Sequence, residues 1–150
     1  MNAYPDTSFL CALYRMQENS AKAAAHFHKM PESLHVTSLL LYEFRQSIRW
    51  QGFLNRHDSG KGFDRKTGAK VLVKLQANIA SGAIVVVPAE WTDVHSIAER
   101  LSTQHTPTGG YRGFDILHVA TALHLGAKEF LTFDINQKKL AHEEGLKVLL

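Results

Sequence analysis

The chain has 150 residues, of which 45% are hydrophobic and 21% charged, and its formal net charge is +3. This composition excludes a disordered chain and is typical of one globular domain, here residues 1–150, with a sizeable core. Because the sequence has neither an apolar run of roughly 20 residues nor a basic amino-terminal leader, we expect a cytoplasmic protein rather than a membrane or secreted one.

The amino-terminal half is expected to alternate short strands with helices. A strand ending near Pro5 leads into an apolar helix opened by Asp6, and this helix contains Cys11, the single cysteine. One cysteine excludes an internal disulfide, and its apolar neighbours favour a buried, inert thiol. The next predicted elements are a helix over residues 20–30, a strand over 34–38, a largely buried helix over 39–51 and a glycine-rich, charged loop over 52–68.

The carboxyl-terminal half continues the alternation. The sequence AIVVVP at residues 83–88 is fully apolar, a pattern typical of a strand buried on both faces of a parallel sheet. The other predicted elements are helices over 69–82, 90–105, 114–125 and 135–145, a loop over 106–113, and strands over 129–134 and 146–150. The order predicts an α/β fold, a three-layer α/β/α sandwich with a central, mostly parallel sheet of about five strands.

Positive charge is concentrated in the middle of the chain. Between residues 45 and 74, eight basic residues stand against two acidic ones, Asp58 and Asp64, which leaves a local charge of +6. The basic residues are Arg45, Arg49, Arg56, Lys61, Arg65, Lys66, Lys70 and Lys74. Such a segment indicates either a phosphate-rich partner or simply a solvated, mobile loop, and the charge alone does not decide between them.

Four acidic residues fall where the predicted fold would gather them. Asp6 follows the first strand, Asp134 ends the strand at 129–134, and Glu43 and Asp115 lie early in helices. In parallel sheets, ligands bind at the carboxyl ends of the strands, so these side chains are expected to meet there. Local capping is an alternative for the three aspartates, but it does not explain Glu43, which lies among apolar neighbours.

Carboxylates brought together repel one another unless a cation offsets their charge. Mg²⁺ prefers oxygen ligands and commonly bridges carboxylates to phosphate oxygens. Together with the basic segment, the four acids therefore indicate metal-assisted attack of water on a phosphodiester.

Four segments in this order resemble the PIN-domain family, the nuclease fold of VapC-type toxins in bacterial type II toxin–antitoxin modules. They are PDTSFL, VTSLLLYEF, RGFDILHVATAL and FLTFD, and they span nearly the whole chain. The resemblance implies a Mg²⁺- or Mn²⁺-dependent endoribonuclease, a cognate antitoxin protein that holds it inactive, and a homodimer. The basic segment is longer than a minimal toxin would need, which indicates either an RNA-binding feature or a branch of the family whose role is not toxicity.

By this resemblance, Asp6, Glu43, Asp115 and Asp134 match the catalytic acids, with the first three as the main metal ligands and Asp134 more peripheral. Thr7, Ser8 and Thr132 match hydroxyl positions that support these carboxylates. Arg112 would contact phosphate or balance the acids, and His118 is either a supporting contact or an ordinary buried histidine. RNA-binding residues would be Arg45, Arg49, Arg56, Lys61, Arg65 and Lys66.

Two other functions compete with this one. A PIN-like RNA-binding module without catalysis would have no reason to place negative charge against phosphate. A phosphohydrolase acting on small esters would have less use for the basic segment.

Overall fold

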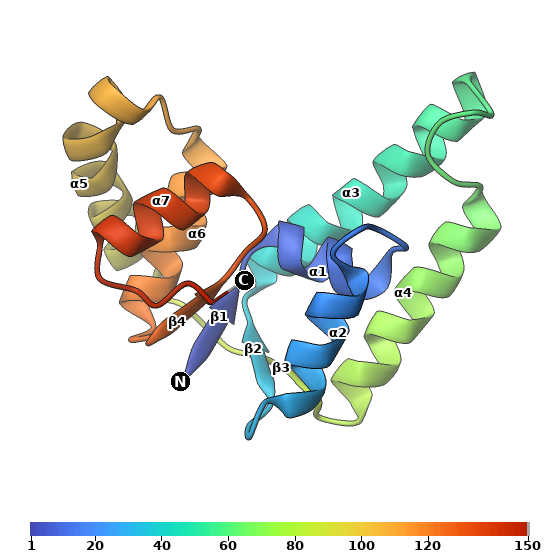
Figure 1. Cartoon of the computed structure of the whole chain (residues 1–150), viewed down its shortest axis with the longest axis horizontal. Coiled ribbons are helices and arrows are strands. Elements are labelled where there is room, and N and C mark those ends of the chain that lie inside the picture. The colour runs from blue at the N-terminus through green and yellow to red at the C-terminus, as the bar shows by residue number, and fades with distance from the viewer. Residues whose placement is uncertain (150) are drawn as a thin grey trace.

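Four short parallel strands form the centre of the protein, in a computed structural model that describes residues 1–149 (Figure 1). Strand β1 (Ala3–Pro5) pairs with β4 (Glu129–Leu131), and β2 (Leu34–Val36) pairs with β3 (Ile84–Val86). Because β1 also lies against β2, the strands follow one another in the order β3, β2, β1, β4.

Seven helices in the described residues cover the two faces of these strands. Figure 1 shows the first four gathered on one side and the last three on the other, so the predicted three-layer α/β arrangement is confirmed. The helices are α1 (Thr7–Tyr14), α2 (Ser20–Lys29), α3 (Ser38–His57), α4 (Arg65–Ala80), α5 (Trp91–Gly109), α6 (Gly113–His124) and α7 (Ile135–Glu143). None of the helices in this part of the chain is long and apolar enough to cross a membrane.

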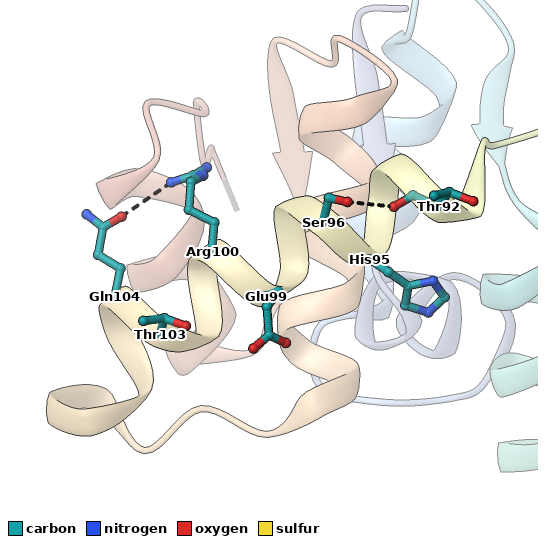
Figure 2. A pocket seen from close by; sticks show the side chains of 7 residues that line it. All are labelled: Thr92, His95, Ser96, Glu99, Arg100, Thr103 and Gln104. Carbon is teal, nitrogen blue, oxygen red and sulfur yellow. Dashed lines mark hydrogen bonds between the residues drawn. The ribbon is translucent and has the colours of Figure 1, made fainter.

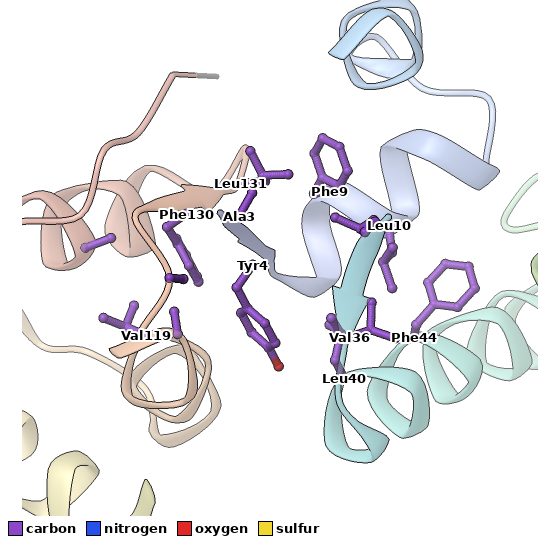
Figure 3. Close-up of a cluster of buried hydrophobic side chains, with 14 of the residues drawn as sticks. Ala3, Tyr4, Phe9, Leu10, Val36, Leu40, Phe44, Val119, Phe130 and Leu131 are labelled. Atoms are coloured by element: carbon purple, nitrogen blue, oxygen red, sulfur yellow. The ribbon is translucent and has the colours of Figure 1, made fainter. Parts of the chain in front are cut away.

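The core joins both helical layers to the strands (Figure 3). Tyr4, Phe9, Phe44 and Phe130 are fully buried and come from β1, α1, α3 and β4. Full burial of one such side chain contributes roughly 1.5–3 kcal/mol, so these aromatic residues fix the helices against the strand ends. Cys11 is buried, as its apolar neighbours predicted.

The predicted loop over residues 52–68 is wrong. Helix α3 continues through Gly52 to His57 and α4 already begins at Arg65, so only residues 58–64 connect them. A single glycine costs a helix about 1 kcal/mol, which the packing of α3 against α4 offsets. Asp64 caps α4 by accepting a 2.7 Å hydrogen bond from the Thr67 amide. Most of the basic segment therefore forms a helical hairpin, which we call the α3–α4 arm (residues 46–72); it projects beyond the strands in Figure 1.

Three other features differ from the prediction. Helix α5 runs through Pro107 to Gly109 and ends where Gly110 adopts a left-handed backbone, so the loop predicted over 106–113 is mostly helical. Strand β3 lies at the edge of the sheet, and Val86 is 44% exposed rather than buried on both faces. The last predicted strand, 146–150, is reduced to one parallel bridge between Lys147 and Glu129, so a fifth full strand is not confirmed; residue 150 lies outside the described residues.

Candidate functional site: an acidic group at the strand ends

Asp6 lies directly after β1 and is fully buried. Its carboxylate caps α1 by accepting a 2.9 Å hydrogen bond from the Phe9 amide, and the Ser8 hydroxyl donates to it at 2.7 Å. Burial raises the pKa of Asp6 above its ordinary value, although hydrogen bonds from Thr132, Ser8 and the Phe9 amide favour the charged form. The local capping role is therefore real, but it leaves a charge in a place where charge is costly.

Thr132 connects Asp6 to the segment that follows β4. Its buried hydroxyl donates a 2.7 Å hydrogen bond to Oδ2 of Asp6 and accepts one of 3.0 Å from the Asp134 amide. Asp134 in turn caps α7, because its Oδ1 accepts a 2.9 Å hydrogen bond from the Gln137 amide. Ser8 completes the connection by accepting a 2.8 Å hydrogen bond from the Phe133 amide. The ends of β1 and β4 are thus joined through hydroxyl groups.

Glu43 reaches the same region from the second turn of α3. Thr7 donates a short hydrogen bond to Oε2 of Glu43, and Nε2 of His118 lies 2.5 Å from the same oxygen. Although partial burial opposes ionisation, the hydrogen bond and charge of His118, with help from Thr7 and Arg112, lower the pKa of Glu43. Since Thr7 follows Asp6 and His118 lies one turn after Asp115, these contacts draw three of the acids into one region.

Asp115 lies in the first turn of α6 and is buried. Arg112 pairs with it at 3.1 Å, and Nε2 of Gln137 lies 3.3 Å from its other oxygen. The hydrogen bond and charge of Asp115, followed by the charges of Asp134 and Glu43, raise the pKa of Arg112. The charges of three of the four acids therefore act on the same guanidinium. Asp6, the fourth acid, is connected to Asp134 through the hydrogen bonds of Thr132.

The four carboxylates are each held by protein donors rather than by one another. Within residues 1–149, no group of three His, Cys, Asp or Glu side chains is already arranged to hold a metal ion. The donor atoms nevertheless suit a hard divalent cation, which prefers carboxylate and hydroxyl oxygens. Two buried acids, Asp6 and Asp115, also supply negative charge that a cation would offset. The residues thus supply the type of ligand that a divalent ion prefers. Binding of the ion would replace some of the hydrogen bonds that these carboxylates now accept.

Gln137 is a residue of this group that the sequence did not single out. It is buried, its amide binds Asp134, and its side chain reaches Asp115. Its position three residues after Asp134 could have indicated it, because a capping carboxylate accepts a hydrogen bond from the amide three residues later. The sequence could not show that the same residue also contacts α6.

Of the predicted RNA-binding residues, Arg45 lies on α3 two residues after Glu43, and the other five lie in the α3–α4 arm. Arg49, Arg56 and Arg65 line a groove of about 730 Å³ between α3 and α4, whereas Lys61 pairs with Asp58 at 3.3 Å. Arg45 lines a neighbouring hollow with Arg49, and Lys66 is exposed at the start of α4.

A separate surface hollow of about 990 Å³ follows the exposed face of α5 (Figure 2). Its side chains come from a single helix and include Thr92, Glu99 and Arg100, with Arg100 hydrogen-bonded to Gln104. None of the four acids lines it, so this hollow is not the site that the sequence predicted.

Comparison with known proteins agrees with the fold. A family model described as the PIN domain matches residues 3–143. Among solved structures, the chain is similar to VapC20 of Mycobacterium tuberculosis, described as a sarcin-ricin loop cleaving toxin, with TM-score 0.64, 19% identity and coverage of 92% of this chain and 94% of that one. It is also similar to FitAcB from Neisseria gonorrhoeae, with TM-score 0.66, 17% identity and coverage of 99% and 96%. No curated protein sequence matches the chain.

Proposed function

Because this chain belongs to the PIN-domain family, whose nucleases generally use divalent metal ions, we propose that it is a Mg²⁺- or Mn²⁺-dependent endoribonuclease. The observation that carries the proposal is the burial of two acids, Asp6 and Asp115, at one end of the parallel strands, together with the hydrogen bonds of Glu43 to Thr7, which follows Asp6, and to His118, one turn after Asp115. A buried charge is expensive unless it is paired or binds a cation, so the two buried acids, beyond their capping and pairing contacts, support a cation at this place.

In this proposal, Asp6, Glu43 and Asp115 hold the cation and Asp134 contributes from the periphery. A bound divalent ion would activate water and offset charge on the phosphate during hydrolysis of the RNA backbone. Thr7, Ser8 and Thr132 keep the carboxylates in place through the hydrogen bonds described above. Arg112, which is 77% exposed in its side chain, is placed to contact a phosphate beside Asp115.

We further propose that the enzyme is the toxin of a toxin–antitoxin pair, working in the cytoplasm as a homodimer. Support comes from the similarity in fold to VapC20, which is described as a sarcin-ricin loop cleaving toxin. A cognate antitoxin would act by covering the acidic group.

The test compares two aspartates in matched positions. Asp115 and Asp93 both lie in the first turn of a helix, but Asp93 is exposed on α5 and contacts none of the acids. Asp115→Asn is expected to lower the rate of RNA cleavage by at least about 10²-fold, the usual cost of removing one charge-stabilising group, and Asp93→Asn to leave it unchanged.

A thermal melt with and without Mn²⁺ or Mg²⁺ gives a second reading that needs no substrate. An ion at 100 times its dissociation constant stabilises the folded state by about 2.7 kcal/mol, or roughly 5–11 °C in Tm for a chain of this size. The shift should appear in the wild type and in Asp93→Asn but not in Asp115→Asn. Unchanged cleavage by Asp115→Asn would refute the assignment, and a wild type without cleavage or metal shift would favour the RNA-binding module.

A further inference from the structure

A row of side chains runs from the acidic group along α3 into the α3–α4 arm. Glu43, Gln46, Trp50, Phe53 and His57 follow one another at spacings of three and four residues, which places them on one face of the helix. With a rise of about 1.5 Å per residue, Trp50 lies roughly 10 Å and His57 roughly 21 Å beyond Glu43 along the axis.

The outer part of this row is aromatic and exposed to solvent. Trp50 and Phe53 are 52% and 49% exposed, and their rings stack with centroids 4.9 Å apart and planes 19° from parallel. The His57 ring continues the series, 4.2 Å from that of Phe53. We call Trp50, Phe53 and His57 the aromatic stripe; all three are exposed, and neighbouring exposed rings are typical of an interaction surface.

Positive charge accompanies these rings. Arg49 and Arg56 are exposed on the same helix, and Arg65 faces them across the groove from α4. Within residues 1–149, none of these three arginines forms an ion pair. Exposed rings flanked by cations are the combination that holds single-stranded nucleic acid, because bases stack on the rings and phosphates pair with the charges.

We propose that the aromatic stripe is a stacking platform for unpaired bases of an RNA strand whose cleaved phosphate lies at the acidic group. The choice of RNA and the direction of the strand rest on the proposed function. A second copy of this chain fits the surface less well, since a two-fold contact would bring the unpaired arginines of both copies together. The platform selects single-stranded segments, because bases inside a duplex cannot leave the stack to reach the rings.

The test measures the affinity of the full chain for labelled RNA in EDTA, where no metal-dependent cleavage occurs. The probes are an oligouridine of about ten nucleotides, within the range of known single-strand sites, and a duplex of the same length. Trp50→Ala is expected to weaken binding of the oligouridine by about 5- to 150-fold, the usual loss for one stacked base, with little effect on the duplex. Trp50→Phe, which keeps a ring, should restore most of the affinity.

Val73→Ala provides the control, because Val73 is 69% exposed on α4 and lies outside the stripe. Equal affinity of wild type and Trp50→Ala for oligouridine would overturn the proposal, as would an equal loss for the duplex. A change in the sedimentation of the protein alone, with RNA affinity intact, would assign the stripe to a protein interface and also overturn it. Cleavage is measured separately with metal, so the two proposals can fail independently. The protein could cleave RNA while the aromatic stripe binds none, or the aromatic stripe could bind RNA while the protein does not cleave it.

Discussion

The hydroxyl of Thr132 links two of the acids, and its removal tests whether the group is held together as described. Thr132 is fully buried; its Oγ1 donates to Asp6 at 2.7 Å, accepts from the Asp134 amide at 3.0 Å, and lies 3.2 Å from the Ser8 hydroxyl. Thr132→Val keeps the shape and volume of the side chain but provides neither donor nor acceptor. Thr132→Ser keeps both and loses one methyl group.

The cost of Thr132→Val follows from these contacts. A hydrogen bond to a charged group contributes about 1.5–3 kcal/mol, and an amide left without its acceptor adds roughly 1 kcal/mol. The free energy of unfolding should therefore fall by about 3 kcal/mol, which corresponds to a drop of roughly 6–12 °C in Tm. Thr132→Ser should cost only about 0.8 kcal/mol, the value of one buried methylene-sized group.

Urea unfolding of both variants at neutral and acidic pH measures these costs. The bond from Thr132 stabilises the charged form of Asp6, so its contribution is present above the folded-state pKa of Asp6 and is lost as the pH falls through that value. Because burial has raised this pKa above its ordinary 3.8, the loss begins at a higher pH than for an exposed aspartate. A cost of Thr132→Val that stays the same in acid, or one that Thr132→Ser shares, would refute the reasoning.

Two further substitutions test contacts away from the acids. Glu144 receives hydrogen bonds from Arg100 at 2.7 Å and His105 at 2.8 Å, and the Arg100 bond is the main cause of its lowered pKa. This stabilisation is present above the ordinary pKa of 4.5 and is lost as the pH falls through the lower folded-state value. Since Arg100 is half exposed, Glu144→Gln should cost only about 0.5–1 kcal/mol at neutral pH and flatten the acid side of the Tm profile. Tyr4→Phe removes the buried hydrogen bond between Tyr4 and Thr37, 2.8 Å long, and should cost about 1 kcal/mol in urea unfolding; a larger loss would show that the cap of α3 depends on it.

The overall fold could be predicted from the sequence because the strands are short and mostly apolar, and each is followed by a helix with its own hydrophobic period. The α3–α4 arm was not, since residues 52–68 combine Gly52 with many charges, which is also the composition of a loop. What makes them helical is the packing of α3 against α4 and the capping of α4 by Asp64, and the first of these depends on residues far apart in sequence. Propensity is a weak guide where tertiary packing decides.

The sequence placed the four acids at the strand ends, but it could not identify their partners. Glu43 binds His118, which is 75 residues away, and the link between Asp6 and Thr132 spans 126 residues. Such contacts depend on how α3, α6 and the strands are turned relative to one another. The pairing of Arg112 with Asp115 was the easier case, because only three residues separate the N-cap of α6 from this position in its first turn.

Helix α6 supplies both an acid and the groups that balance the acids. Arg112, the N-cap residue of α6, pairs with Asp115 in the first turn of the helix, while His118, three residues after Asp115, reaches Glu43 on α3. The two partners differ in exposure: the side chain of Arg112 is 77% exposed and that of His118 is 1% exposed. Releasing Arg112 to solvent costs at most about 1 kcal/mol, whereas removing His118 from Glu43 would leave a buried polar ring without its partner. If a cation bound at the acids, replacing Arg112 beside Asp115 would be the exchange of least cost, and it would leave the guanidinium available to a phosphate.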